Sequence, residues 1–70
     1  MLKHLEFMKE EVDVHPQSGE SKEKTIYDLY LYEDQLVVWG WGKVDTLPVE
    51  AFERVKNYFS TKGFSLIHES

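Results

Sequence analysis

Residues 25–44 contain two apolar-rich runs separated by a short polar turn. The runs 25–32 and 36–44 are rich in Tyr, Trp, Val and Leu, a composition and alternation typical of strands. The turn at residues 33–35 lacks the Asn-Gly pair that would fix a hairpin register. A three-residue loop predicts an antiparallel hairpin that pairs residue 31 with 37, 29 with 39 and 27 with 41. One face of this hairpin then carries six core side chains, those of Tyr27, Leu29, Leu31, Val37, Trp39 and Trp41.

The opposite face of the expected hairpin is too apolar for a purely solvated surface, since half-buried sheets usually have a polar side. It carries Ile26, Asp28, Tyr30, Tyr32, Leu36 and Val38. Tyrosine is enriched at the energetic centres of protein interfaces. The acidic residues 28, 33 and 34 would form the rim of this surface. We therefore interpret this face as a contact surface for a partner.

The segment before the hairpin is predicted to be a strand followed by a loop. Apolar residues 2, 5 and 8 have helical spacing, whereas residues 5 and 7, and 12 and 14, alternate as in a strand. We favour the strand for residues 1–14, because the sheet needs another strand. Residues 15–24 combine Pro, Gly and Ser with charged side chains, which predicts a flexible loop.

The segment after the hairpin is predicted to be a helix and a last strand. Asp45-Thr46 offers an N-cap, Pro48 fits the first turn, and an apolar stripe at residues 49, 52, 55 and 59 continues to about Thr61. Lys62-Gly63 is a typical C-cap, and residues 64–68 alternate like an edge strand. The chain is thus expected to be a single α+β domain over residues 1–70. We expect a small antiparallel sheet of three to four strands packed on one α-helix, in the order β-loop-β-β-α-β.

Composition and charge bear on the cellular location of the protein and on the kind of partner that it can bind. The 70 residues include no Cys, which excludes disulfides and suits a cytoplasmic location. The start of the chain lacks the apolar region of a signal peptide, and no run approaches the roughly 20 apolar residues of a membrane helix. The net charge of −5, from 13 acidic and 8 basic residues, argues against general binding to phosphate backbones. It fits either a simply solvated surface or an acidic face that docks on a basic one.

Candidate chemistry is weak in this sequence. The three His residues have no metal-ligand spacing, so we expect no metal site, and no cofactor motif is present. Glu50 and Glu53 lie on one helix turn without a cleft that would shift their pKa values. No Ser has a nucleophile-elbow context, and residues 40–43 lack the spacing of a phosphate-binding loop. We therefore expect no catalytic residues and no enzyme activity.

Residues 25–64 resemble the WGR domain, a family named for its Trp-Gly-Arg motif. The matching pieces are Tyr27-Asp28-Leu29, Leu36-Val37-Val38, Trp41-Gly42-Lys43-Val44 and Lys62-Gly63-Phe64. Lys43 stands where the family has Arg, Asp45 stands where it has Gly, and its Gly-Gln loop and following strand are missing. The resemblance implies a module that binds nucleic acid or neighbouring domains, with Lys43 as the residue that would contact nucleic acid.

Two functions follow from these patterns. The first is non-enzymatic binding of another protein by a small acidic accessory or inhibitor, of the kind that phages and mobile elements carry. The partner would have a basic or nucleic-acid-binding surface, and a homodimer is a second way to cover the same face. The expected partner-binding residues are Asp28, Tyr30, Tyr32, Glu33, Asp34 and Val38. The alternative is a degenerate WGR-type nucleic-acid-binding module.

Overall fold

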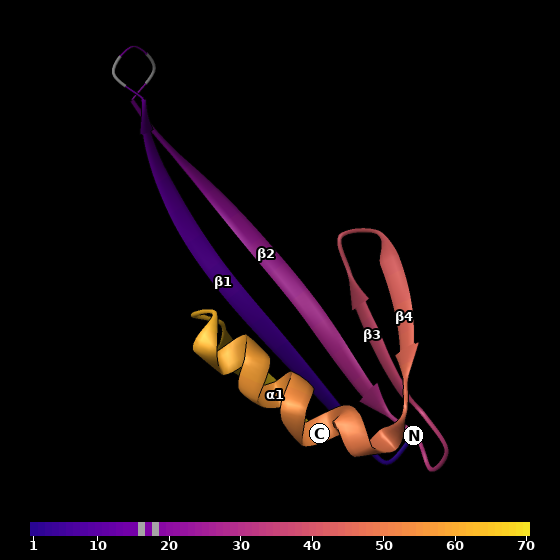
Figure 1. The fold of residues 1–70 in the computed structure, drawn as a ribbon. Coiled ribbons are helices and arrows are strands. Elements are labelled where there is room, and N and C mark those ends of the chain that lie inside the picture. The colour runs from indigo at the N-terminus through magenta and orange to yellow at the C-terminus, as the bar shows by residue number, and fades with distance from the viewer. Residues whose placement is uncertain (16, 18) are drawn as a thin grey trace.

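The chain forms one five-stranded antiparallel sheet with a short helix on one face (Figure 1). The structure is a computed structural model that describes residues 1–15, 17 and 19–70. The order of the strands in the sheet is β4-β3-β2-β1-β5. The elements are β1 (Lys3–His15), β2 (Gly19–Leu31), β3 (Leu36–Gly40), β4 (Lys43–Leu47), the 3₁₀ helix η1 (Val49–Ala51), α1 (Phe52–Thr61) and β5 (Ser65–Glu69). The α+β class is confirmed, with five strands in place of the expected three to four.

Strands β1 and β2 form a long hairpin that extends beyond the helix and the other strands (Figure 1). The strand predicted for residues 1–14 is confirmed. The loop predicted for residues 15–24 is wrong over most of its length, because β2 begins at Gly19 and pairs with β1 from there. Cross-strand backbone hydrogen bonds do not depend on side-chain polarity, so the exposed polar residues 21–24 can pair without being buried. Residues 16 and 18 of the predicted loop lie outside the described residues.

The β2–β3 register differs by one residue from the expected register. The structure pairs Leu31 with Leu36, Leu29 with Val38 and residue 27 with residue 40. Four residues, 32–35, connect the strands, and the backbone N–H of Tyr32 donates to the carbonyl of Gln35 at 2.9 Å. A slip of one residue moves every side chain of β3 to the other face. Leu36 and Val38 therefore face the helix, and the side chains at 37 and 39 face away from it.

A second tight turn produces the unexpected fifth strand. Trp41 and Gly42 both have positive φ, 54° and 68°. Two central residues with positive φ form the type I′ turn that matches the twist of a hairpin. The strand predicted for residues 36–44 therefore breaks at this turn, and the chain returns as β4. The N-cap predicted at Asp45-Thr46 is wrong, because these residues lie in β4 and the helical segment begins only after Pro48.

The C-terminal predictions are confirmed. Helix α1 ends at Thr61, and the backbone N–H of Lys62 donates to the carbonyls of Tyr58 and Phe59. Gly63 follows with φ of +88°, as glycine commonly does after a helix. Strand β5 pairs antiparallel with β1 and forms one edge of the sheet.

The core lies between α1 and the sheet face that it covers. Its buried residues are Leu5, Phe7, Leu29, Leu36, Val38, Ala51 and Phe59. Within the described residues, no helix is long and apolar enough to span a membrane. Because a single ten-residue helix covers only one side, the opposite side of the sheet is left for other contacts.

Candidate functional site

The sheet face turned away from α1, here called the open face, is an aromatic and apolar surface with two carboxylates near its centre. The strand registers place the side chains at its centre in two neighbouring cross-strand rows. One row is His68, Glu6, Asp28, Trp39 and Val44, and the other is His4, Tyr30, Val37 and Thr46. Trp39 is 49% exposed and Val44 48%, although both belong to strands. Monomeric proteins rarely leave a contiguous apolar surface uncovered, so the open face is the first candidate for a binding site.

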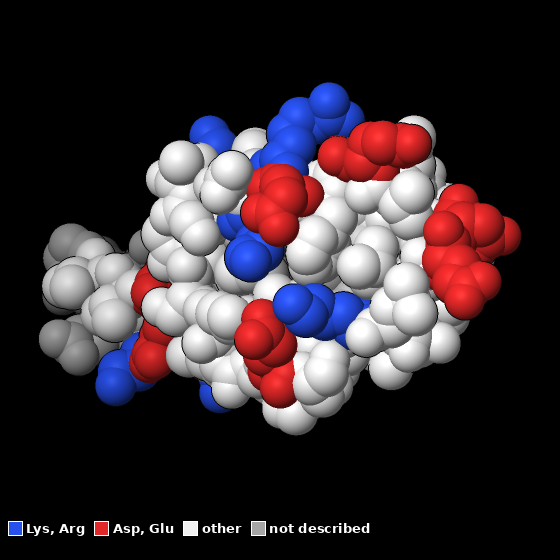
Figure 2. Space-filling view, turned by 90° about the horizontal axis from the view of Figure 1, so that it is seen from below, with Lys and Arg blue, Asp and Glu red and all other residues white. Residues whose placement is uncertain are grey.

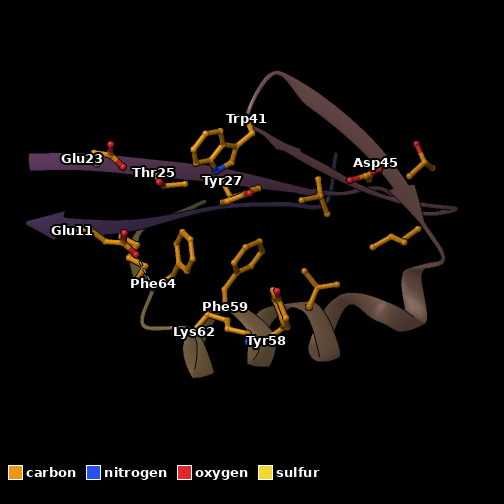
Figure 3. A pocket seen from close by; sticks show the side chains of 15 residues that line it. Glu11, Glu23, Thr25, Tyr27, Trp41, Asp45, Tyr58, Phe59, Lys62 and Phe64 are labelled. Atoms are coloured by element: carbon orange, nitrogen blue, oxygen red, sulfur yellow. Dashed lines mark ion pairs between the residues drawn. The ribbon is translucent and has the colours of Figure 1, made fainter. Parts of the chain in front are cut away.

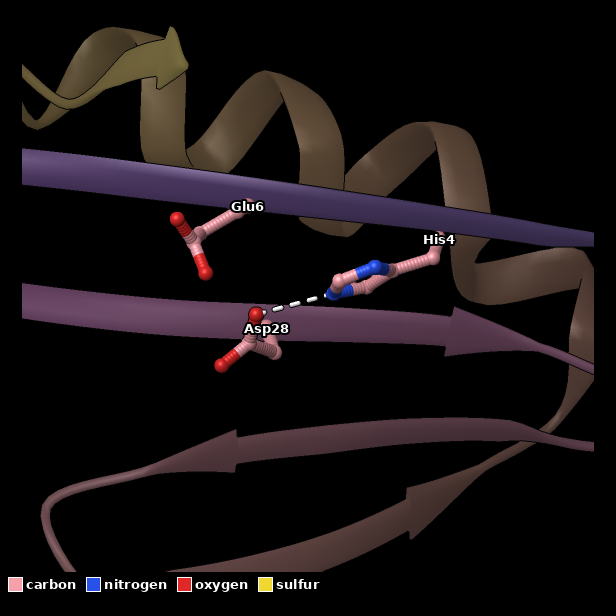
Figure 4. A group of neighbouring side chains, drawn as sticks. All are labelled: His4, Glu6 and Asp28. Atoms are coloured by element: carbon pink, nitrogen blue, oxygen red, sulfur yellow. Dashed lines mark hydrogen bonds and ion pairs between the residues drawn. The ribbon is translucent and has the colours of Figure 1, made fainter. Parts of the chain in front are cut away.

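A histidine–carboxylate cluster lies within the open face. Nε2 of His4 and Oδ1 of Asp28 are 2.9 Å apart, and the Glu6 carboxylate lies close to them, with ligand atoms of all three residues within 4.8 Å of one another (Figure 4). The His4 ring stacks on the Tyr30 ring with centroids 4.5 Å apart and planes 2° apart. The ring of His68 lies on the other side, with its centroid 5.3 Å from that of His4. The cluster thus draws on three neighbouring strands.

The cluster also influences the ionisation of Tyr30. Burial raises the pKa of its hydroxyl, and repulsion from the Asp28 carboxylate, the ionised form of Tyr32 and the Glu6 carboxylate raises that pKa further. A tyrosine hydroxyl is already protonated at neutral pH and can donate a hydrogen bond. The raised pKa keeps the Tyr30 hydroxyl in this form to higher pH.

The two open-face carboxylates have little positive charge around them. None of the residues in the two rows is Lys or Arg. Among the described residues, Asp28 is paired with His4, and the other ion pair joins Lys9 to Glu11. A partner cation could therefore approach Glu6 and Asp28 without displacing a lysine or arginine of these two rows.

A groove of about 580 Å³ lies on the opposite side, between α1 and the sheet (Figure 3). Its inner wall is aromatic, with the rings of Tyr27, Phe59 and Phe64 in mutual contact. Trp41 reaches it from the β3–β4 turn, and Tyr58 lines it from the helix. The Lys9–Glu11 ion pair lies among the residues that line it. Such a groove suits an apolar side chain, and its charged residues carry both signs.

The structure brings together only part of the predicted partner-binding set. Asp28 and Tyr30 are neighbours on the open face. Glu33 and Asp34 are exposed in the β2–β3 turn, with partly exposed Tyr32 at its start. The placement predicted for Val38 is wrong, because only 9% of this residue is exposed and it belongs to the core.

Sequence reasoning also missed residues of this surface. Trp39 was expected in the core and instead lies on the open face, because the register is slipped. Trp41, also expected in the core, is 71% exposed. His4 and Glu6 alternate with the apolar residues 5 and 7, so the strand pattern of residues 1–14 carried the signal for their common face. Their proximity to Asp28 depends on the pairing of β1 with β2, which no local pattern indicates.

No protein-family model matches this chain, and neither the curated proteins nor the solved structures include a match. The WGR resemblance therefore stays a prediction. Lys43, its candidate nucleic-acid contact, is exposed at the start of β4.

Proposed function

We propose that this chain is a non-enzymatic protein that binds an arginine-bearing surface of another protein through its open face. The observation that supports the proposal is the cross-strand row in which Asp28 lies between Glu6 and Trp39. This row sets two carboxylates beside a half-exposed indole, and Tyr30 lies in the adjacent row.

A guanidinium group matches this arrangement in two ways. It forms paired hydrogen bonds with a carboxylate, and its plane stacks on an aromatic ring. Cation–π contacts contribute about 0.5–1 kcal/mol at exposed sites and more when water is excluded. Lysine satisfies only the charge, so we propose arginine as the main anchor on the partner.

The net charge of −5 extends this complementarity to the whole chain. Acidic residues 33 and 34 at the β2–β3 turn would speed the approach of a basic partner, because rim charges act mainly on association rate. A small acidic accessory or inhibitor of a basic, nucleic-acid-binding protein fits this description, and phage or mobile-element inhibitors are of this type. We propose Asp28, Tyr30, Tyr32, Glu33, Asp34 and Trp39 as the contact residues.

Three forms of the protein test the proposal in a capture experiment from nuclease-treated source lysate. The wild type and Tyr58→Ala should recover the same partner, whereas Trp39→Ala should lose it. Tyr58 is a matched control, because it is 56% exposed but lies on α1. Purified partner should then bind Trp39→Ala or Tyr30→Ala more weakly by about 2 kcal/mol each. Equal binding of wild type, Trp39→Ala and Tyr30→Ala would remove the open face from consideration.

The arginine anchor is tested on the purified partner. Replacing the partner's interface arginines with lysine should weaken its binding to the wild-type chain strongly. The Asp28→Asn variant of the chain should bind the wild-type partner and the Arg-to-Lys partner with equal affinity. Sedimentation of the protein alone across a dilution series tests the homodimer, which would bury the same face symmetrically. A dimer that is lost in Trp39→Ala would show that a second copy occupies the open face instead.

A further inference from the structure

Three side chains with metal-ligating groups converge at one point of the open face. His4 and Glu6 are two residues apart on β1 and so point to the same side of the sheet. Asp28 lies directly opposite Glu6 on β2. One imidazole nitrogen and one oxygen from each carboxylate all lie within 4.8 Å of one another (Figure 4).

The distances between these ligand atoms are close to those between the ligands of a coordinated ion. Zn²⁺ binds nitrogen and oxygen ligands at about 2.0–2.2 Å, which separates tetrahedral ligands by about 3.4 Å. His4 and Asp28 are already within this separation at 2.9 Å. The other ligand atoms lie at most 4.8 Å apart, so they must approach one another by at most about 1.4 Å to reach that separation.

The kinds of donor atom in the cluster favour a particular class of ion. Mg²⁺ and Ca²⁺ prefer sites made only of oxygen, whereas an imidazole ligand suits Zn²⁺ and its transition-metal neighbours. Two carboxylates would balance the charge of a divalent ion. The ring of His68 stands beside His4 and offers a further nitrogen donor at the edge of the cluster.

The His4 ring is also held in place before any ion binds. The ring of Tyr30 stacks on one side of the His4 ring, and the His4 side chain is only 19% exposed. The side chain of Asp28 is 24% exposed. Partial burial and stacking reduce the side-chain freedom that ligands would lose on binding.

From this geometry we propose that His4, Glu6 and Asp28 bind a divalent transition-metal ion, with Zn²⁺ as the representative. The ion would coordinate Nε2 of His4 and Oδ1 of Asp28 and so replace the hydrogen bond that joins these two atoms. The site shares Glu6 and Asp28 with the proposed arginine contact. Metal binding is measured on the isolated chain, so its outcome is distinguishable from that of the partner-binding test.

Isothermal titration of the purified full chain with Zn²⁺ tests the site directly. We expect saturable binding of one ion per chain and no comparable binding of Mg²⁺. His4→Gln, Glu6→Gln and Asp28→Asn should each lower the Zn²⁺ affinity by at least about tenfold, an effect that even outer-sphere partners of metal ligands reach. Glu53→Gln is the matched control, because it removes the same charge from an exposed position on α1 and should leave the affinity unchanged.

Imidazole NMR of the unmutated protein gives a second readout that does not depend on variants folding. Zn²⁺ should shift the ring resonances of His4. Zn²⁺ affinity that is equal in the three ligand variants and in Glu53→Gln would overturn the proposal. The absence of both binding heat and a His4 shift in the wild type would overturn it as well.

Discussion

Trp41 has a backbone conformation that residues other than glycine rarely adopt. Its φ of 54° falls in the left-handed region, and it is followed by Gly42 at 68°. For a residue other than glycine this region costs about 1–2 kcal/mol. The indole is 71% exposed and thus recovers little of this energy by burial. An exposed, strained Trp beside a groove is more consistent with a contact role than with the core role expected from sequence.

Replacing Trp41 should therefore not unfold the domain. We expect Trp41→Asn to raise the free energy of unfolding by about 1 kcal/mol, because Asn tolerates the left-handed region. Urea unfolding monitored by circular dichroism measures the change. Gly42→Ala, in the same turn, should lower stability, since alanine is strained at positive φ. A loss of about 3–5 kcal/mol in Trp41→Asn, typical of truncating a buried Trp, would contradict the exposed placement.

Gly40 is required for a different reason. The ring of Tyr27 lies where a Cβ of residue 40 would be, so any side chain there must displace it. We expect Gly40→Ala to lower the free energy of unfolding by about 1–3 kcal/mol, as overpacking does. The double variant Gly40→Ala/Tyr27→Leu should lose less than the two single changes combined, because the clash disappears. Strict additivity in urea unfolding would show that the ring does not press on this position.

At the scale of elements, the buried side chain of Phe59 packs α1 against the sheet. The ring of Phe59 lies 5.2 Å from Phe7, 5.0 Å from Tyr27 and 5.2 Å from Phe64, measured between centroids. These rings belong to β1, to β2 and to the segment that leads into β5. The helix is only ten residues long, so tertiary packing and not helix propensity must stabilise it.

Truncation of Phe59 should therefore release the helix. We expect Phe59→Ala to lower the free energy of unfolding by about 3–5 kcal/mol, which is comparable to the total stability of many small domains. Tyr58→Ala, one residue earlier and 56% exposed, is the control and should change stability by about 0.5 kcal/mol or less. Thermal denaturation of both variants gives the comparison. Equal melting temperatures would mean that the groove side of α1 is not packed as described.

At the scale of the whole molecule, charge is spread over an elongated shape. The principal extents are 50 × 21 × 19 Å. On the face seen in Figure 2, Lys and Arg side chains are interspersed with acidic and uncharged ones. A surface of this kind offers no continuous basic track on that face for a nucleic-acid backbone.

We therefore expect no measurable affinity for duplex DNA at physiological salt, because few phosphates can be neutralised. Fluorescence anisotropy with a labelled duplex at several salt concentrations provides the measurement. Micromolar or tighter binding with a steep salt dependence would instead favour the WGR-type function. In that case Lys43→Ala should reduce the salt slope by about one unit, whereas Lys56→Ala on α1 should leave a WGR-type contact intact.

The sequence by itself determined the α+β class, the N-terminal strand, the end of α1 and the last edge strand. These features rest on local causes, namely apolar periodicity, the Lys-Gly cap and β-rich composition, which act within a few residues. It also indicated Asp28 and Tyr30 as surface neighbours, although from a register that was wrong.

Only the tertiary structure decided the register of β3, the fifth strand and the histidine–carboxylate cluster. A shift of one residue exchanges the two faces of a strand, and local alternation is equally satisfied by both. The burial of Leu36 and Val38 under the helix selects one of them and turns Trp39 outward. In the same way, His4, Glu6 and Asp28 meet because 24 residues of chain return to pair β2 with β1. The pairing of β1 with β2 is a long-range contact, and the residue pattern within either strand does not predict it.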